Sequence, residues 1–288
     1  MYARFGALAK TQKILYEFPY EDVHLVSWNV RISDYAQKGH GHEAIKCFHQ
    51  MQDEGVSTNA ITYICVLKAC SIAESLTIGE DIDARVRKLG LLEKDIVLGN
   101  TLVDMYTKCG ALKKAQQILE ELPVRDAISW NALIAGCASM GQGHETLSYF
   151  EQMRSEGHSP DAVTFISILR ACGSIKNSDK GEEIHEVITR HGWLEKDITL
   201  GNALTDMYVK CGMLSKAQEV LEGLRGKDIV SWNALISGFS QEGQYEEALG
   251  CFQRMQSEGF SPDAIIFTCL LKACGNAHHN LSKMFLEA

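Results

Sequence analysis

The segment LGNALTDMYVKCG at residues 200–212 occurs almost unchanged as LGNTLVDMYTKCG at residues 98–110. The two copies begin 102 residues apart, and the same distance separates the tryptophans of three SWN tripeptides, Trp28, Trp130 and Trp232. Two further sets of residues have this spacing: Met51, Met153 and Met255, and Cys70, Cys172 and Cys274. Self-similarity at a fixed distance is the signature of a repeat protein, so the chain is expected to be an array.

Each block of 102 residues divides into three repeats of 35, 36 and 31 residues, each with the pattern of two helices joined by a glycine-containing turn. In the repeat 127–161 an apolar stripe of helical spacing consists of Trp130, Leu133, Ile134 and Cys137. Gly141 and Gly143 are expected to end this first helix, and a second apolar face follows at 147–153. Neither helix can bury its stripe alone, so the pattern predicts an all-α solenoid of stacked helix pairs.

The repeat boundaries follow from the 102-residue spacing. Complete repeats are expected at 25–59, 60–95, 96–126, 127–161, 162–197, 198–228 and 229–263, with partial repeats at 1–24 and 264–288. The whole chain, 1–288, is therefore expected to form a single solenoid. Because the partial repeats have no polar capping helix, we expect a piece of a longer array.

The composition is that of a folded protein, with 45% hydrophobic and 23% charged residues. No apolar run is long enough to cross a membrane, and no secretory signal or Arg- and Ser-rich transit segment is visible. The ten cysteines include no CxxC pair and recur at fixed places in the repeats, which indicates helix packing. The formal net charge of −9 argues against nucleic-acid binding unless basic residues gather on one face.

The alternation of 35, 36 and 31 residues, with openings such as SWNALI, TFISILRAC and LGNALTDMYVKCG, resembles the plant PLS subclass of pentatricopeptide-repeat proteins along essentially the whole chain. By this resemblance the P repeats are 25–59, 127–161 and 229–263, the S repeats are 96–126 and 198–228 with a partial one at 1–24, and the L repeats are 60–95, 162–197 and a truncated 264–288. The resemblance implies a right-handed superhelical solenoid (α-α superhelix). It also implies a groove that binds single-stranded RNA, one nucleotide per repeat.

In that family the fifth and last residues of a repeat read the base. The corresponding pairs in this chain are Asn29 with Asn59, Asn100 with Asp126, Asn131 with Asp161, Asn202 with Asp228, and Asn233 with Asp263. By the family's rules the Asn–Asp pairs favour uracil and the Asn–Asn pair favours a pyrimidine. An amide carries both a donor and acceptors, which suits the edge of a pyrimidine. We expect these amides to form a ladder that is open to solvent.

Two further sets of residues are candidates for RNA contacts. The residues three before the asparagines are expected to sandwich the bases: Val26, Val97, Ile128 and Val230. Continuation of the same helix face predicts phosphate-facing cations at Lys68, Lys108, Arg170, Lys210 and Lys272. The L repeats have Ile64, Ile166 and Thr268 at the fifth place, so no base preference is assigned to them.

Other interpretations stay open at this point. A tetratricopeptide-like solenoid that binds a protein or peptide has the same helix-turn-helix shape and suits the acidic charge. The asparagines follow Ser or Gly and could be helix caps, whereas the tryptophans are assigned to the core.

The chain has neither HxE nor PCxxC, so we expect no deaminase-like E and DYW domains, no enzyme activity, no metal and no other cofactor. The resemblance implies an RNA editing or processing factor of mitochondria or chloroplasts that works with an enzyme in trans, without a membrane or a small-molecule substrate.

Overall fold

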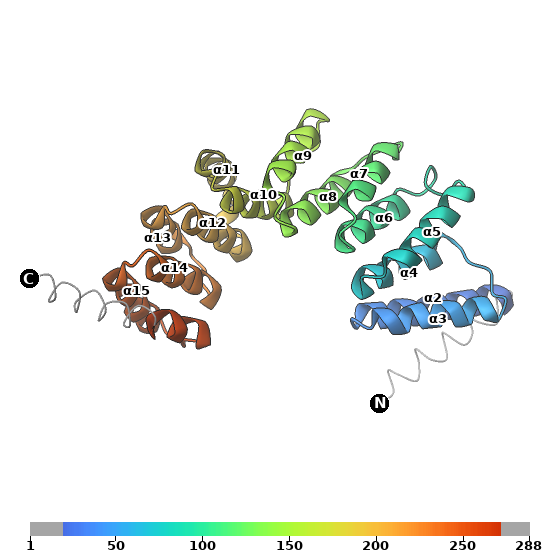
Figure 1. Ribbon diagram of the computed structural model, residues 1–288, viewed down its shortest axis with the longest axis horizontal. Coiled ribbons are helices and arrows are strands. Elements are labelled where there is room, and N and C mark those ends of the chain that lie inside the picture. The colour runs from blue at the N-terminus through green and yellow to red at the C-terminus, as the bar shows by residue number, and fades with distance from the viewer. Residues whose placement is uncertain (1–19, 272–288) are drawn as a thin grey trace, which may run out of the picture. The chain divides into compact units, whose positions relative to one another are not determined.

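The computed structural model describes residues 20–271, and all regular elements in this range are helices (Figure 1). The first helices of the repeats are α2 (Tyr20–Gln37), α4 (Ala60–Ala73), α6 (Ile96–Lys108), α8 (Ala127–Ser139), α10 (Ala162–Ile175), α12 (Ile198–Lys210) and α14 (Ile229–Gln241). The second helices are α3 (Gly41–Asp53), α5 (Leu76–Lys88), α7 (Leu112–Glu121), α9 (Gly143–Ser155), α11 (Ser178–Arg190), α13 (Leu214–Gly223) and α15 (Tyr245–Ser257). A short 3₁₀ helix, η1 (Trp193–Glu195), follows α11, and residues 264–271 are helical. The prediction of an all-α protein is confirmed.

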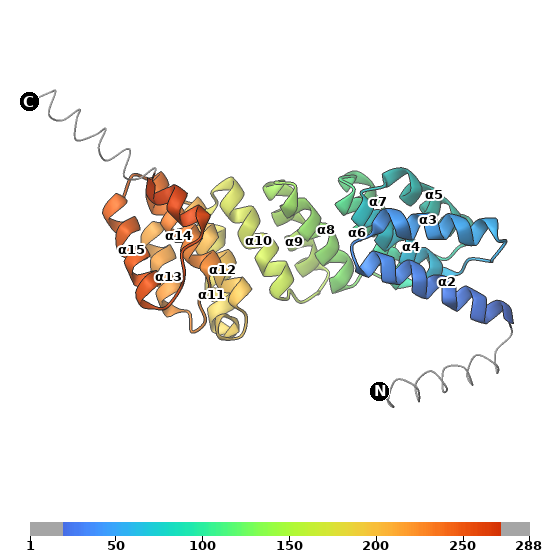
Figure 2. The ribbon, with the colours of Figure 1, turned by 90° about the horizontal axis from the view of Figure 1, so that it is seen from below.

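Within the first 136 residues each helix contacts its neighbours along the chain. Helix α2 packs on α3 and α4, α4 packs on α5 and α6, and α6 packs on α7 (Figure 1, Figure 2). The first helices thus form one layer and the second helices cover it. This is the nearest-neighbour packing of a solenoid.

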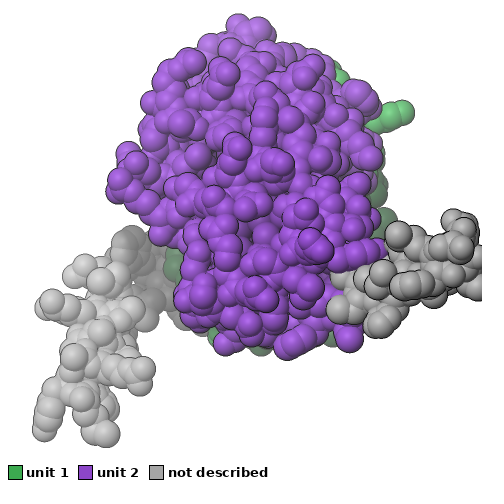
Figure 3. Space-filling model, turned by 90° about the vertical axis from the view of Figure 1, so that its left-hand side faces the viewer, with its two compact units in different colours: residues 1–136 green, residues 137–288 purple. Residues whose placement is uncertain are grey.

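From residue 137 onward the same order holds. Helix α10 packs on α9, α11 and α12 (Figure 2). Helix α12 packs on α13 and α14, and α14 packs on α15. The chain divides into two compact units, one ending at Gly136 and the other beginning at Cys137 (Figure 3). Such divisions are natural in a repeat array, because its contacts are local in sequence.

The residues that mark the period are core residues. Trp28, Trp130 and Trp232 are buried, as predicted, and the three methionines of the same spacing are fully buried. Cys70 and Cys172 are also fully buried. The thiols of Cys109 and Cys211 approach the carbonyl oxygens of Cys70 and Cys172 at 3.8 and 3.9 Å, so these cysteines pack neighbouring first helices together. Cys274 lies outside the described residues.

Glycines have two different roles at the turns between the helices. Gly141 has a φ of +73° and ends the turn after α8, as expected of a left-handed helix terminus. Gly143 does not end that helix, contrary to the prediction, because it is the first residue of α9. Gly41 holds the same place at the start of α3, where an added Cβ would lie 2.7 Å from the carbonyl oxygen of Ala69. Glycine is required there because one helix starts directly against the backbone of the next.

Candidate functional site

The asparagines at the fifth place of the repeats lie inside the first helices and not at their starts. They are not the helix caps, so that alternative is wrong. The residues that cap these helices are instead the last residues of the preceding repeats, among them Asn59, Asp95, Asp161, Asp197 and Asp228. Each of these accepts a hydrogen bond from a backbone N–H in the first turn of the following helix.

Stacking of the repeats brings fifth and last residues together across 26 to 30 residues of sequence. The Nδ2 atoms of four asparagines donate to the last residue of their own repeat: Asn29 to Asn59 at 3.4 Å, Asn100 to Asp126 at 3.1 and 3.2 Å, Asn202 to Asp228 at 2.9 Å, and Asn233 to Asp263 at 2.7 Å. The predicted pairs are therefore in contact at these four repeats. The pairing of Asn131 with Asp161 stays a prediction.

Each last residue thus serves two neighbours at once. Asp228 accepts from the backbone N–H groups of Val230 and Ser231 at 2.9 and 3.1 Å and also holds the amide of Asn202. Burial raises the pKa of Asp228, but the hydrogen bonds from Asn202 and Ser231 outweigh it and the pKa is lowered. The pKa of Asp263 is likewise lowered, first by the hydrogen bond from Asn233 and then by the N–H of Ile266. Both carboxylates are therefore stabilised in the charged form.

The amide ladder is less open than predicted. Asn29 and Asn100 are buried, at 7% and 8% exposure, whereas Asn131, Asn202 and Asn233 are of intermediate exposure. In each of the four observed pairs the last residue of the repeat lies against the amide. The Oδ1 atoms of Asn29, Asn100, Asn202 and Asn233 are buried and have no hydrogen-bond partner. An unpaired buried acceptor costs about 1–3 kcal/mol, so its recurrence at four equivalent places needs an explanation.

The aliphatic residues three positions earlier are exposed. Val26, Val97, Ile128 and Val230 are each more than half exposed although they are large and apolar. Three more exposed residues, which were not predicted, hold the second place of the repeats expected at 60–95, 162–197 and 264–288: Ile61, Val163 and Ile265. Their position in the repeat was the signal that could have found them.

One cleft shows how these groups are arranged. It lies between α2 and α4 and is lined by Val26, Val30 and Ile61 with the amide of Asn29. Apolar side chains from two consecutive repeats therefore flank a polar amide. A flat aromatic ring fits between such walls, because its faces are apolar and its edge carries hydrogen-bonding groups.

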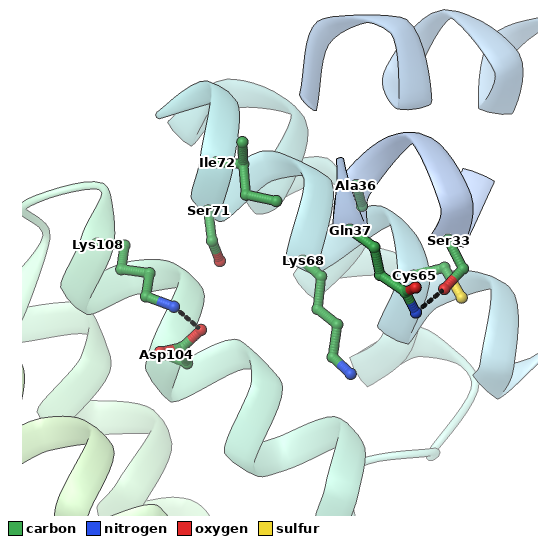
Figure 4. A pocket seen from close by; sticks show the side chains of 9 residues that line it. All are labelled: Ser33, Ala36, Gln37, Cys65, Lys68, Ser71, Ile72, Asp104 and Lys108. Carbon is green, nitrogen blue, oxygen red and sulfur yellow. Dashed lines mark hydrogen bonds and ion pairs between the residues drawn. The ribbon is translucent and has the colours of Figure 1, made fainter. Parts of the chain in front are cut away.

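The predicted cations are not equivalent. Lys68 and Arg170 are exposed and form no ion pair within the described residues. Lys108 and Lys210 each donate to an aspartate one turn earlier, Asp104 at 2.9 Å and Asp206 at 2.7 Å. Figure 4 shows Lys68, Asp104 and Lys108 in one pocket between the first helices. The acidic partners weaken the expected basic stripe, and Lys272 lies outside the described residues.

Many of the acidic residues lie on the second helices and are paired there. Neighbouring second helices are joined by Arg87 with Glu121, Lys114 with Glu80, Lys180 with Glu151, Lys216 with Glu182, and Arg254 with Glu222. These pairs are exposed or half-exposed and connect consecutive repeats. These five glutamates are thus paired with cations on the second helices, whereas the asparagines lie on the first helices.

Two kinds of site do not occur in the described part of the chain. No three His, Cys, Asp or Glu side chains between residues 20 and 271 could hold a metal ion. Within that range no helix has the length and apolarity that a membrane span requires.

Family models match the repeats directly. The model of the PPR repeat family matches residues 23–71, 125–174 and 227–276, and a model of the PPR repeat matches residues 100–126 and 202–229. These matches cover more than half of the chain.

Relatives and a solved structure agree with these matches. A chloroplastic pentatricopeptide repeat-containing protein of Arabidopsis thaliana is 35% identical over 276 residues, which is 96% of this chain and 44% of the relative. A mitochondrial one from the same plant is 31% identical over 287 residues, 100% of this chain and 45% of the relative. The chain thus spans under half the length of these relatives.

The crystal structure of the pentatricopeptide repeat protein PPR10 in complex with an 18-nt psaJ RNA element has the same fold. Its TM-score is 0.75 at 23% identity, over 92% of this chain and 40% of that one. The matched repeats and this fold together establish that the chain belongs to the pentatricopeptide-repeat (PPR) family.

Proposed function

We propose that this chain binds single-stranded RNA along its first helices and that each repeat with Asn at the fifth place reads one base. The observation that carries the proposal is the repeated arrangement of an amide held by the acid of its own repeat, with an unpaired buried Oδ1. The exposed aliphatic residues beside each amide support it.

The chemistry of the amide suits a pyrimidine. Its Oδ1 can accept from N3–H of uracil or from the amino group of cytosine, and its second Nδ2 hydrogen can be donated to a carbonyl oxygen. Because the unpaired Oδ1 is buried, pairing with a base requires the asparagine side chain to turn outward. By the family's rules the repeats from 25 to 263 would read pyrimidine, unspecified, uracil, uracil, unspecified, uracil, uracil.

Aliphatic residues at the second place would hold each base by its faces. The cleft at Asn29 has Val26 on one side and Ile61, from the following L repeat, on the other. The exposed Val163 and Ile265 extend this arrangement to the other L repeats. L repeats would thus supply stacking surfaces even where their fifth residue, such as Ile166, offers no hydrogen bond.

The biological role proposed here is that of a specificity factor for RNA editing or processing in mitochondria or chloroplasts. The division into P, L and S repeats and the chloroplastic and mitochondrial relatives support it. The PPR10 complex supports the class of ligand, because a protein of this fold holds RNA. In this role the chain contributes binding, and an enzyme in trans contributes the chemistry.

The second candidate is a solenoid that binds a basic peptide, and the net charge of −9 favours it. Binding of a fluorescent pyrimidine-rich RNA, compared with DNA of the same sequence and with duplex RNA across salt, separates the two functions. A preference for single-stranded RNA is expected. Equal and weak binding to all three would favour the peptide.

The assignment of individual bases is tested by Asn202→Thr. By the family's rules this change shifts the preference opposite the repeat 198–228 from uracil toward guanine. Asn177→Thr is the matched control, because Asn177 caps a second helix by accepting from the N–H of Lys180 and lies outside the ladder. Selection from random RNA should return the same motif for the control and the wild type. The same motif for Asn202→Thr would show that Asn202 does not read a base.

A further inference from the structure

We propose that a buried hydroxyl, at the third place of the helix following a reading repeat, is a positioning residue for base discrimination. In unit 1 this residue is Ser129, and in unit 2 it is Ser231. The inference rests on the proposed function and deepens it. It adds a third member to the fifth and last residues, namely a side chain that never touches the base.

Ser129 is fully buried and forms a closed ring of hydrogen bonds with Asp126. The N–H of Ser129 donates to Oδ1 of Asp126 at 2.8 Å, and the N–H of Asp126 donates to Oγ of Ser129 at 2.9 Å. The hydroxyl of Ser129 in turn donates to the carbonyl oxygen of Asp126 at 2.8 Å. The hydroxyl of Ser129 therefore fixes the backbone of Asp126, and the N–H of Ser129 fixes its carboxylate.

The fixed carboxylate is the group that orients the reading amide. Both of its oxygens accept from Nδ2 of Asn100, at 3.1 and 3.2 Å. Asn100 is more than nine-tenths buried, and its Oδ1 has no hydrogen-bond partner. That unpaired acceptor indicates a missing ligand donor, and its direction depends on how the amide is held. The serine therefore acts on the base through two intervening side chains.

Unit 2 contains the same arrangement. The hydroxyl of Ser231 lies 3.2 Å from both the carbonyl oxygen and Oδ1 of Asp228, which holds Asn202 at 2.9 Å. Ser231 is also fully buried. Ser231 and Asp228 form a capping box at the start of α14, so the group that orients Asn202 is held by the same contacts that begin the helix.

The last residue Asn59 carries an amide in place of a carboxylate, and Thr62 makes the same kind of contacts with it. Its Oδ1 accepts from both the N–H and the hydroxyl of Thr62, at 2.9 and 3.0 Å, so the oxygen must face the helix and Nδ2 must occupy the other branch. The same oxygen also accepts from Nδ2 of Asn29 at 3.4 Å, so it faces both the helix and the reading amide. The N–H of Thr62 sets the orientation of the Asn59 amide, and the hydroxyl of Thr62 adds a second hydrogen bond that holds it.

The distribution of the hydroxyl in the chain follows the reading amides. Four of the five repeats with Asn at the fifth place are followed by a third-place hydroxyl: Thr62, Ser129, Thr164 and Ser231. The L repeats, which have Ile64 and Ile166 at the fifth place, are followed by Leu98 and Leu200. The exception is the repeat 229–263, where Ile266 follows Asp263 and supplies only its backbone N–H, at 3.1 Å.

The exception provides a control within the same protein. Ser231→Ala removes the hydroxyl behind the reading pair Asn202–Asp228, whereas Ile266→Thr adds one behind Asn233–Asp263. Binding is measured to RNAs in which only the nucleotide opposite one of these two repeats is varied. The readout is the ratio of Kd values for uracil and the other bases at that nucleotide.

Ser231→Ala is expected to lower this ratio about threefold to tenfold opposite the repeat 198–228, the factor that one hydrogen bond contributes. The ratio opposite 229–263 should not change, and Ser231→Thr should retain the wild-type value. A purely structural defect would instead lower affinity for every RNA alike. Ile266→Thr is expected to raise the ratio opposite 229–263.

The outcomes separate the inference from the proposed function. If the wild type shows no base discrimination, the proposed function fails first. If the wild type discriminates and Ser231→Ala keeps the same ratio, the positioning role of Ser231 is wrong. Should Ser231→Ala lose its helical circular dichroism, Ile266→Thr decides, and an unchanged ratio for a folded Ile266→Thr overturns the inference.

Discussion

The charge of the groove can be tested at the pocket that contains Lys68, Asp104 and Lys108 (Figure 4). Lys68 has no acidic partner within the described residues, whereas Lys108 donates to Asp104 at 2.9 Å. If both lysines face RNA phosphates, Lys68 should contribute fully and Lys108 only partly, because Asp104 compensates its charge. Lys68→Ala should therefore weaken RNA binding, and Asp104→Asn should strengthen it.

The magnitude follows from counterion release. For a single strand each neutralised phosphate contributes a slope of about −0.7 in log K against log salt. Lys68→Ala should reduce the magnitude of the slope by about 0.7, so between 50 and 200 mM salt the variant loses about 2.6-fold less affinity than the wild type. Asp104→Asn should increase the magnitude by up to about 0.7. An exposed ion pair of this kind stabilises folding by only about 0.3–0.5 kcal/mol, so its loss should not unfold the helix.

The assay is fluorescence anisotropy with a pyrimidine-rich RNA at five salt concentrations. Lys114→Ala is the matched control, because Lys114 is paired with Glu80 on the second helices, away from the asparagines. Its slope should equal that of the wild type. Equal slopes for Lys68→Ala and Lys114→Ala would refute the phosphate-facing position of Lys68. Weaker binding by Asp104→Asn would refute the compensation of Lys108.

Three further predictions concern stability, pH and thiol chemistry. Gly41→Ala should destabilise the fold by about 1–3 kcal/mol, because the added Cβ meets the backbone of α4. Gly250→Ala is the control, because its Cβ has free space, and it should stabilise the fold by about 0.5–1 kcal/mol. Urea unfolding measures both variants, and similar midpoints would contradict the close approach at Gly41. The pKa values of Asp228 and Asp263 are lowered in the folded protein, so their stabilising hydrogen bonds are complete above the unfolded carboxyl pKa of about 3.9 and are lost as pH falls through the lower folded values. The preference for uracil should therefore stay constant from pH 8 to pH 5. A loss of this preference between pH 8 and pH 5 would disprove the prediction. Burial raises the pKa of the Cys70 thiol to about 12, so iodoacetamide at pH 7.5 should leave it unmodified in the folded protein, as peptide mass spectrometry would reveal; rapid labelling would mean that the first helices separate.

Much of this protein could be read from local patterns. The spacing of Trp28, Trp130 and Trp232 predicted both the repeat and its core, because a helix buries one stripe whatever its neighbours are. The pairing of Lys108 with Asp104 could also have been predicted, since residues four apart share a helix face.

Stacking of the repeats decided the rest. The bond between Asn100 and Asp126 joins residues 26 apart, and the burial of the amide follows from that bond rather than from any local propensity. The bonds between Ser129 and Asp126 are local and could have been predicted as a helix cap, but the link from Asp126 to Asn100 depends on stacking. The sequence alone determined which side chains could meet, since it sets the period and the helix faces. Only the tertiary structure determined which atoms are paired and which remain unpaired, because hydrogen bonds depend on distances that the packing of neighbouring helices establishes.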